Sequence, residues 1–127
     1  MSEEMDPLND IFVDKNEPVD KKILVEIIKP YATIDKEGIV NFTDEYEKLT
    51  ESKKTLVYLC CKKAMILREI PEIDEGCGPK EISEKARVSL NGAKQAVSVT
   101  YKKILGKDSN GTIIPNYNLK KVKDILL

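Results

Sequence analysis

The sequence predicts a mostly α-helical fold with a small amount of β structure, which is the α+β class. Apolar residues recur at helical spacing in several segments, including a long one near residues 52–70. Two pairs of short apolar stretches, at 32–42 and 104–114, flank glycine-containing turns and predict β-hairpins. With 127 residues, of which 41% are hydrophobic, the chain is long enough for one domain with a modest core.

Residues 1–20 are acidic, and we expect them to form a mobile tail. They contain seven acidic residues and one lysine, interrupted by an apolar group around Leu8, Ile11 and Phe12. Two interpretations remain open: this group folds back on the domain, or it binds a protein partner. The acidic N-terminus does not resemble a signal peptide, and no apolar run approaches the roughly 18 residues of a membrane span. We therefore expect a cytoplasmic protein without membrane contact.

Residues 21–50 are predicted to form an extension that precedes the main domain. Asp20 is a suitable N-cap for a helix that Pro30 ends. In the hairpin that follows, Gly38 stands where the turn favours a positive φ. Thr43 is expected to cap a short helix after the hairpin.

A longer helix is predicted from near Ser52 to the residue before Pro71. Its apolar positions cover so broad a face that we expect contacts on two sides. These positions are Leu56, Leu59, Cys60, Ala64 and Leu67, with Val57, Cys61 and Met65 beside them.

Three cysteines and no histidine limit the chemistry of the chain. A zinc site usually takes four Cys or His ligands, so none is expected, and no imidazole is present to act as a base. We expect Cys60 and Cys61 to be small buried hydrophobic residues, with a Cys61–Cys77 disulfide as the alternative. There is no phosphate-binding loop and no dinucleotide fingerprint, so the sequence predicts a protein that is not an enzyme and needs no cofactor.

Residues 78–97 predict two short helices separated by a tight turn. Pro79 suits the first turn of the first helix, and Ser89 suits the N-cap of the second. Val88 is an apolar residue that can fill the space between the two helices. The second helix is predicted to face inward through Ala93, Val97, Thr100 and Tyr101.

The opposite face of the second helix carries no acidic residue. Acids are absent from Leu90 through Gly106, whereas the solvent-facing side of an ordinary helix mixes both signs of charge. Residues 76–127 contain ten basic and four acidic residues, a net charge of +6, although the whole chain has a net charge of −1. Amide, hydroxyl and ammonium groups on such a face can contact the base edges and phosphates of DNA. The outward residues are Asn91, Lys94, Gln95, Ser98 and Lys102.

The segment KEISEKARVSLNGAKQAV, residues 80–97, resembles the helix-turn-helix core of winged helix-turn-helix transcription regulators. Residues 104–115, with the turn at Asn110–Gly111, resemble the two-stranded wing of that family. Arg87 and Ile104 depart from the pattern because they stand where glycine is common, and Arg87 costs up to about 1 kcal/mol if its φ is positive. The resemblance implies a winged helix-turn-helix domain at residues 51–127 that ends in a further helix.

For function, the resemblance implies sequence-specific binding of double-stranded DNA by a transcription regulator. The recognition helix would begin at Ser89 and enter the major groove, and the wing at 104–115 would contact the backbone or the minor groove. The residues expected to contact DNA are Lys80, Ser89, Asn91, Lys94, Gln95, Ser98, Lys102, Lys107 and Asn110.

Alternatives remain for the C-terminal helix and for the function. The helix after the cap Asn118 has an apolar face that either closes the core or forms a homodimer contact. An alternative function is that of a winged-helix protein–protein interaction subunit of a transcription or replication assembly, with little DNA affinity of its own. In a third arrangement, the acidic tail covers the basic face as a mimic of DNA. The apolar face of the C-terminal helix consists of Leu119, Val122, Ile125 and Leu126.

Overall fold

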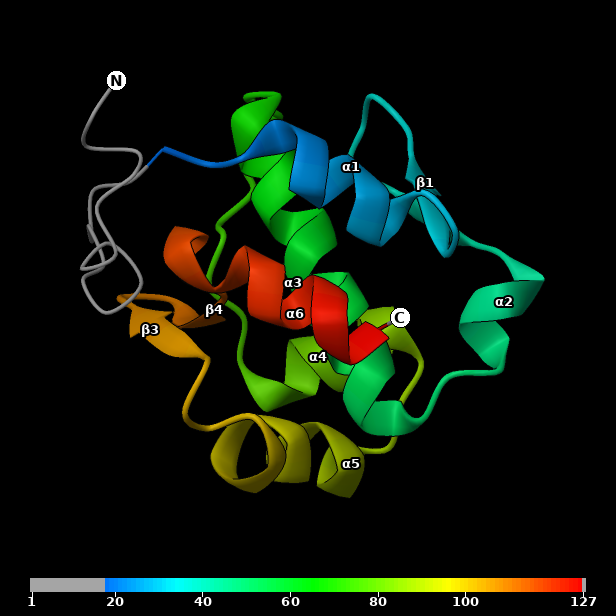
Figure 1. Cartoon of the computed structure of the whole chain (residues 1–127), viewed down its shortest axis with the longest axis vertical. Helices are drawn as coiled ribbons and strands as arrows, with labels where there is room; N and C mark the ends of the chain where they lie inside the picture. Colours follow the sequence, from blue (N-terminus) through cyan, green and yellow to red (C-terminus); the bar gives the residue numbers. More distant parts are fainter. Residues whose placement is uncertain (1–17, 127) are drawn as a thin grey trace, which may run out of the picture.

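The computed structural model describes residues 18–126 (Figure 1). Residues 1–17 and 127 lie outside this range, and so do the predicted partner-binding residues Leu8, Ile11 and Phe12. Helices predominate, and the β structure consists of two separate two-stranded antiparallel sheets, which confirms the α+β class. In chain order the elements are α1 (Lys21–Ile28), β1 (Ala32–Ile34), β2 (Val40–Phe42), α2 (Asp44–Glu47), α3 (Glu51–Leu67), α4 (Pro79–Ala86), α5 (Leu90–Gln95), the π-helix η3 (Ala96–Thr100), β3 (Gly106–Asp108), β4 (Gly111–Ile113), the 3₁₀-helix η4 (Asn116–Asn118) and α6 (Leu119–Leu126).

Helix α1 and the β1–β2 hairpin form as the sequence predicts. The Asp20 carboxylate accepts hydrogen bonds of 3.1 Å from two backbone N–H groups in the first turn of α1. The two strands pair around a turn in which Gly38 has a φ of +88°. The Thr43 hydroxyl caps α2, and the ring of Tyr46 in α2 stacks on Phe42 with 3.8 Å between the ring centroids. The cap and turn residues therefore determine where these short elements begin and end.

Helix α3 runs through the middle of the molecule, and α1, α4, α5 and α6 all pack against it (Figure 1). Ten of its seventeen residues are buried, so the predicted contact on two sides is confirmed. The helix ends at Leu67, three residues before the predicted end. Glu69 adopts a left-handed φ of +57°, and Ile70 N donates to Met65 O at 3.2 Å, which closes the helix C-terminus. Leu67 was predicted on the inward stripe but is exposed.

One hydrophobic core includes residues from α1 through α6. Leu119, Val122 and Leu126 are buried, Ile125 is partly buried, and α6 packs against α1 and α3, so the apolar face of α6 closes the core. Asn118 does not act as the predicted side-chain cap. Its Nδ2 donates instead to Ile104 O at 2.8 Å, because the chain enters α6 through η4 and the Asn118 side chain turns into the protein.

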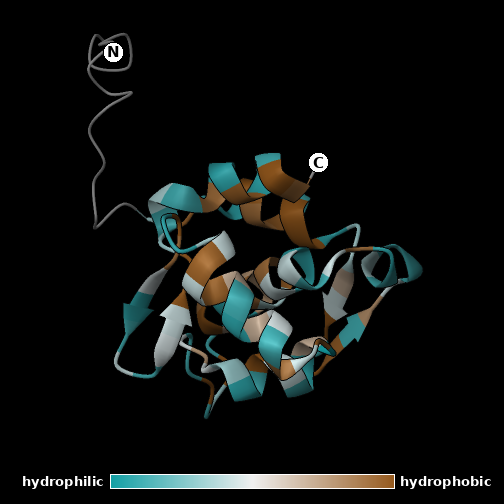
Figure 2. Ribbon diagram, turned by 90° about the horizontal axis from the view of Figure 1, so that it is seen from below, coloured by the Kyte–Doolittle hydropathy of each residue, from teal (hydrophilic) through white to brown (hydrophobic). Residues whose placement is uncertain are grey.

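The helices are amphipathic rather than uniformly apolar. Figure 2 shows hydrophobic and hydrophilic residues alternating along them. A helix of this kind buries one side and exposes the other. Among the helices that the structure describes, none combines the length and the apolar composition needed to cross a bilayer.

All three cysteines are buried and unpaired. The prediction that Cys60 and Cys61 are small core residues is confirmed, and no Cys61–Cys77 disulfide is present. Burial raises the pKa of the Cys61 thiol to about 12 and that of Cys77 to about 12. These thiols are therefore protonated and unreactive near neutral pH.

Two adjacent lysines of α3 are buried, which the sequence did not indicate. Lys62 Nζ lies 2.8 Å from Glu81 Oε2 in α4. Lys63 Nζ lies 2.7 Å from Glu75 Oε2 and 2.6 Å from Asn116 Oδ1. Because Glu75 precedes α4 and Asn116 follows β4, these contacts connect the central helix to the segments on both sides of the C-terminal half.

Candidate nucleic-acid interface

Helices α4 and α5 are joined by the tight turn that the sequence predicts. Pro79 occupies the first turn of α4, where its missing N–H has no partner to lose. Ser89 caps α5, because its Oγ accepts a hydrogen bond of 2.9 Å from Gly92 N. Val88 is buried in the turn, and its carbonyl accepts a hydrogen bond of 2.7 Å from Ser83 Oγ. The turn thus holds α5 in a defined orientation on α4.

Arg87 is the one residue of this turn with a left-handed backbone, at a φ of +62°. A side chain at such a position costs up to about 1 kcal/mol relative to glycine. The guanidinium lies 3.5 Å from Glu47 Oε1 and 5.6 Å from the centroid of the Phe42 ring. Arg87 therefore contacts α2 and β2, which offsets part of the backbone cost.

Helix α5 ends after six residues, and the chain continues directly into the π-helix η3. From Ala96 to Thr100 it widens into a π-helix, with Tyr101 N donating to Ala96 O at 2.9 Å. Ala93 and Ala96 are fully buried, while Val97 and Tyr101 are partly buried. Thr100 was predicted to face inward and is exposed. Thr100 stands at the end of the wider turn, which shifts its side chain from the position that a regular α-helix would give it. Ala96 is buried because it lies three residues after Ala93, on the same helical face.

The outward face of α5 and η3 is exposed and free of acids, as predicted. The chain has no acidic residue between Glu84 and Asp108, so the acid-free stretch includes the turn, α5 and η3. Helix α5 lies at the lower edge of Figure 1, on the side from which Figure 2 is seen. Leu90 and Val99 are large apolar residues exposed on the same segment. All five predicted outward residues are among the exposed polar residues from Asn91 to Lys103, which are Asn91, Lys94, Gln95, Ser98, Thr100, Lys102 and Lys103.

The β3–β4 hairpin follows this segment. Its turn comprises Ser109 and Asn110, and Asp108 Oδ1 accepts hydrogen bonds from Asn110 N at 2.7 Å and Gly111 N at 3.1 Å. The first strand begins at Gly106 rather than at the predicted Ile104, because residues 101–104 still form helical turns. Lys107 and Asn110 are exposed on the hairpin.

A short bridge connects the hairpin to the segment that leads into α4. Cys77 N donates to Thr112 O at 3.0 Å, and Thr112 N donates to Cys77 O at 2.8 Å. No sequence pattern predicted this pairing, because the two residues are distant in the chain. The bridge places the hairpin beside the start of α4.

The geometry produces a groove of about 600 Å³ between the start of α4, η3 and the β3–β4 hairpin. Ser98, Lys102 and Lys107 line it, so the structure brings three of the predicted DNA-contact residues together. None of the residues lining this groove is acidic. The other predicted residues are exposed but lie outside it: Lys80, Ser89, Asn91, Lys94, Gln95 and Asn110.

One acidic residue contacts the start of α5, and sequence reasoning missed it. Ser89 N donates to Glu51 Oε2 at 2.6 Å, and Ser89 Oγ donates to Glu51 Oε1 at 3.0 Å. A β-carbon on Gly92 would lie 2.5 Å from Glu51 Oε1, so a glycine is needed for this approach. Two hydrogen bonds from Ser89 lower the pKa of Glu51: the one from the backbone N–H has the larger effect, and the one from the hydroxyl has the smaller effect. A carboxylate thus occupies the N-terminus of α5 and engages both donors of Ser89.

Within residues 18–126, no three Cys, Asp or Glu side chains are grouped so that they could hold a metal ion. Comparisons with protein-family models, with curated proteins and with solved structures find no match for this chain. What the protein does is therefore inferred from the geometry and charge of its surface.

Proposed function

We propose that this chain is a double-stranded DNA-binding protein of the winged helix-turn-helix kind that acts as a transcription regulator. Helices α4 and α5 are the helix-turn-helix, the helical segment from Ser89 enters the major groove, and the β3–β4 hairpin is the wing on the backbone or minor groove. The observation that carries the proposal is the exposed, acid-free surface of α5 and η3, with a lysine-lined groove between it and the hairpin.

The side chains of this surface form two groups, those that can contact base edges and those that can contact phosphates. Asn91 and Gln95 have amides that can pair with base edges, and Val99 can contact a thymine methyl group. Because Glu51 occupies the N-terminus of α5, phosphate contacts come from ammonium groups rather than from the backbone of Ser89. The ammonium groups are those of Lys80, Lys94, Lys102 and Lys107.

Salt dependence tests the proposal quantitatively. Four lysines on four phosphates predict a slope of about −3.6 for the logarithm of the binding constant against the logarithm of salt concentration. The affinity should then fall about 150-fold between roughly 50 and 200 mM salt. Fluorescence anisotropy with a labelled duplex measures this slope. An affinity that does not change with salt would rule out the proposed interface.

Matched lysine variants localise the interface. Lys107→Ala on the β3–β4 hairpin and Lys102→Ala should each reduce the magnitude of the slope by about 0.9. Lys36→Ala is the control, because Lys36 is an exposed lysine of the β1–β2 hairpin on the opposite side of the molecule (Figure 1). Gln95→Ala should instead change which sequences are selected from a pool of genomic fragments. Equal effects of Lys36→Ala and Lys107→Ala would contradict the assignment.

A second candidate function is that of a winged-helix subunit that binds another protein through the same face. It is favoured by Val99 of η3, an apolar side chain that is 63% exposed. This alternative predicts little DNA affinity, together with a protein complex that Val99→Asp disrupts and salt barely affects. The anisotropy experiment separates the two functions, since only DNA binding gives the steep slope.

A further inference from the structure

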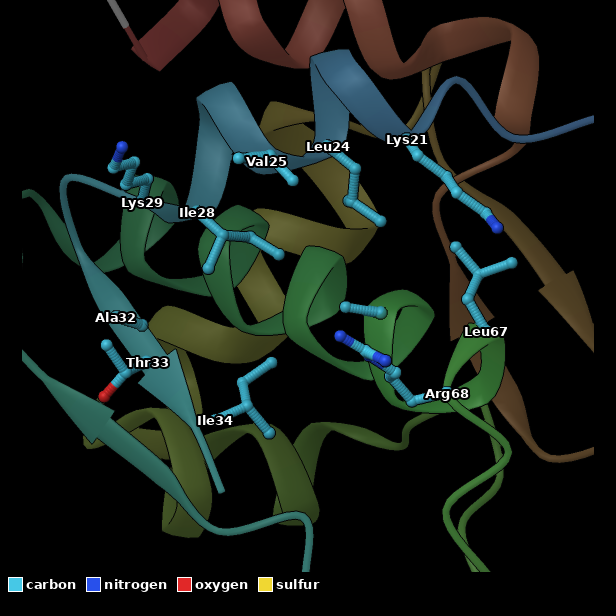
Figure 3. Close-up of a pocket in the computed structure, with 11 residues that line it drawn as sticks. Lys21, Leu24, Val25, Ile28, Lys29, Ala32, Thr33, Ile34, Leu67 and Arg68 are labelled. Carbon is cyan, nitrogen blue, oxygen red and sulfur yellow. The ribbon is translucent and has the colours of Figure 1, made fainter. Parts of the chain in front are cut away.

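An apolar groove lies on a different side of the molecule from the proposed DNA surface. It has a volume of about 610 Å³ and is bounded by α1, β1 and the C-terminal turn of α3. Figure 3 shows Leu24, Ile28 and Ile34 pointing into this space. We call it the α1–α3 groove, and its lining is Lys21, Leu24, Val25, Ile28, Lys29, Ala32, Thr33, Ile34, Ala64, Leu67 and Arg68.

The groove leaves apolar side chains in contact with water. Leu24, Ile28 and Ala32 are buried in its floor, whereas Val25 is 57% and Leu67 is 37% exposed at its edge. No segment within residues 18–126 covers these two side chains. Exposed aliphatic groups beside an apolar hollow of this size are typical of a binding site.

The charges around the groove have one sign. Lys21, Lys29 and Arg68 line it, and none of its lining residues is acidic. Within the part of the chain that the structure describes, none of these three cations forms an ion pair. The groove therefore suits an occupant that is both apolar and acidic.

We propose that the α1–α3 groove binds residues 8–13 of the same chain, with the sequence LNDIFV. Residues 1–17 contain six acidic residues and one lysine, so their charge is complementary to the groove. Leu8, Ile11, Phe12 and Val13 supply apolar side chains for its floor. Residues 8–13 are separated from the first lining residue, Lys21, by seven residues, and from the first described residue, Pro18, by four.

The covalent connection makes this arrangement reachable. Val13 is five residues from Pro18, and five extended residues span about 17 Å. Helix α1, which forms one wall of the groove, has eight residues and is about 12 Å long. A connection of this length gives an effective concentration near 1 mM, so a segment that binds with a Kd of only about 0.1 mM would occupy the groove about 90% of the time.

The groove is a better site for this segment than the α5–η3 face. That face is also basic and borders a groove of similar volume, but only Val97 and Leu105 are branched aliphatic residues in the lining of that groove. The α1–α3 groove has five such residues for contact with Phe12: Leu24, Val25, Ile28, Ile34 and Leu67. Occupation of the α1–α3 groove leaves the proposed DNA surface open. The inference therefore does not depend on DNA binding, and either can fail without the other.

Paramagnetic relaxation enhancement in the full-length chain tests the inference. A nitroxide is attached to Asn9→Cys; the native cysteines are buried and do not compete for the label. We expect broadening of the amide signals of Thr33, Ile34, Leu67 and Arg68. The control is a nitroxide-labelled chain that also carries Ile11→Ser and Phe12→Ser. Its label is still attached to the same chain, so it shows the broadening that covalent proximity alone produces. This broadening should be several-fold weaker at the four amides.

Two surface variants provide the matched comparison. Val25→Glu introduces a carboxylate at the groove and should abolish the broadening. Ile39→Glu makes the same change at a residue that is equally exposed, at 55%, but outside the groove, and should leave the broadening intact.

Three results would overturn the inference. One is broadening confined to the α5–η3 face, which would mean that the tail covers the DNA surface. Another is broadening that the two serine substitutions leave unchanged. The third comes from a mixture of two preparations, one isotope-labelled without nitroxide and the other nitroxide-labelled without isotope. Broadening in this mixture would assign the contact to a second copy of the chain.

Discussion

The buried ion pair between Lys63 and Glu75 allows us to predict which of two single variants loses more stability. The Lys63 side chain is 4% exposed and that of Glu75 is 22% exposed. Glu75→Gln leaves an ammonium group in the interior without a counter-charge. Removing one partner of a buried pair costs about 3–5 kcal/mol, and because water reaches Glu75 we expect the lower end or somewhat less, about 2–3 kcal/mol.

Lys63→Met should cost less, below about 1.5 kcal/mol. The methionine fills a similar volume, and the carboxylate that remains is the member of the pair that water can reach. The double variant Lys63→Met with Glu75→Gln should be more stable than Glu75→Gln alone, because it leaves no unpaired buried charge at this site. Lys48→Met is the control, since the Lys48–Glu45 pair is 72% and 63% exposed and should matter by less than about 0.5 kcal/mol.

Urea unfolding followed by circular dichroism measures these differences as shifts in midpoint at constant slope. The reasoning would be refuted if Lys63→Met cost as much as Glu75→Gln, or if Glu75→Gln behaved like the Lys48→Met control. A change in slope would mean that the variant alters the unfolded ensemble and would require a calorimetric measurement of the same series.

Other perturbations address the contact between Glu51 and α5 and the core. Gly92→Ala should displace the Glu51 carboxylate and change the chemical shift of the Ser89 amide proton by as much as Glu51→Gln changes it. An unchanged chemical shift would contradict the 2.5 Å distance between Glu51 Oε1 and a β-carbon on residue 92. Because the folded-state pKa of Glu51 is lowered from 4.5, the stability from this contact is fully present above pH 4.5 and is lost as the pH falls through the lower folded-state value. The Ser89 amide shift should therefore titrate with a midpoint below 4.5, and a higher midpoint would disprove the assignment. Tyr46→Phe should lower the free energy of unfolding by about 1–3 kcal/mol, because the buried Ala86 carbonyl loses its hydroxyl donor; urea unfolding within error of the parent would count against this.

Local chemistry made much of the fold predictable. Asp20, Thr43 and Ser89 cap helices because their side chains reach backbone N–H groups two or three residues away. Gly38 turns the hairpin because it adopts a positive φ without strain. The outward positions of α5 followed from helical periodicity, and all of them are exposed.

Predictions failed where the local pattern was overridden. The π-helix at Ala96–Thr100 leaves Thr100 exposed, and periodicity of the ordinary α-helix could not anticipate a wider turn. Asn118 looked like a cap because it precedes an amphipathic helix, but a distant carbonyl, that of Ile104, takes its hydrogen bond. Helix α3 ended early because Glu69 adopts a left-handed backbone that no glycine or proline indicated.

The sequence by itself determined the helices, the two hairpins, the acid-free face and the acidic tail, since each depends on the order of neighbouring side chains. Only the tertiary structure decided that Lys62 and Lys63 are buried beside carboxylates, that Glu51 occupies the start of α5, and that Cys77 pairs with Thr112. These contacts join residues that are 12 to 38 positions apart in the chain, from Lys63–Glu75 at the shorter end to Glu51–Ser89 at the longer. Their energies depend on burial and on distance in space, and neither quantity is encoded in local periodicity.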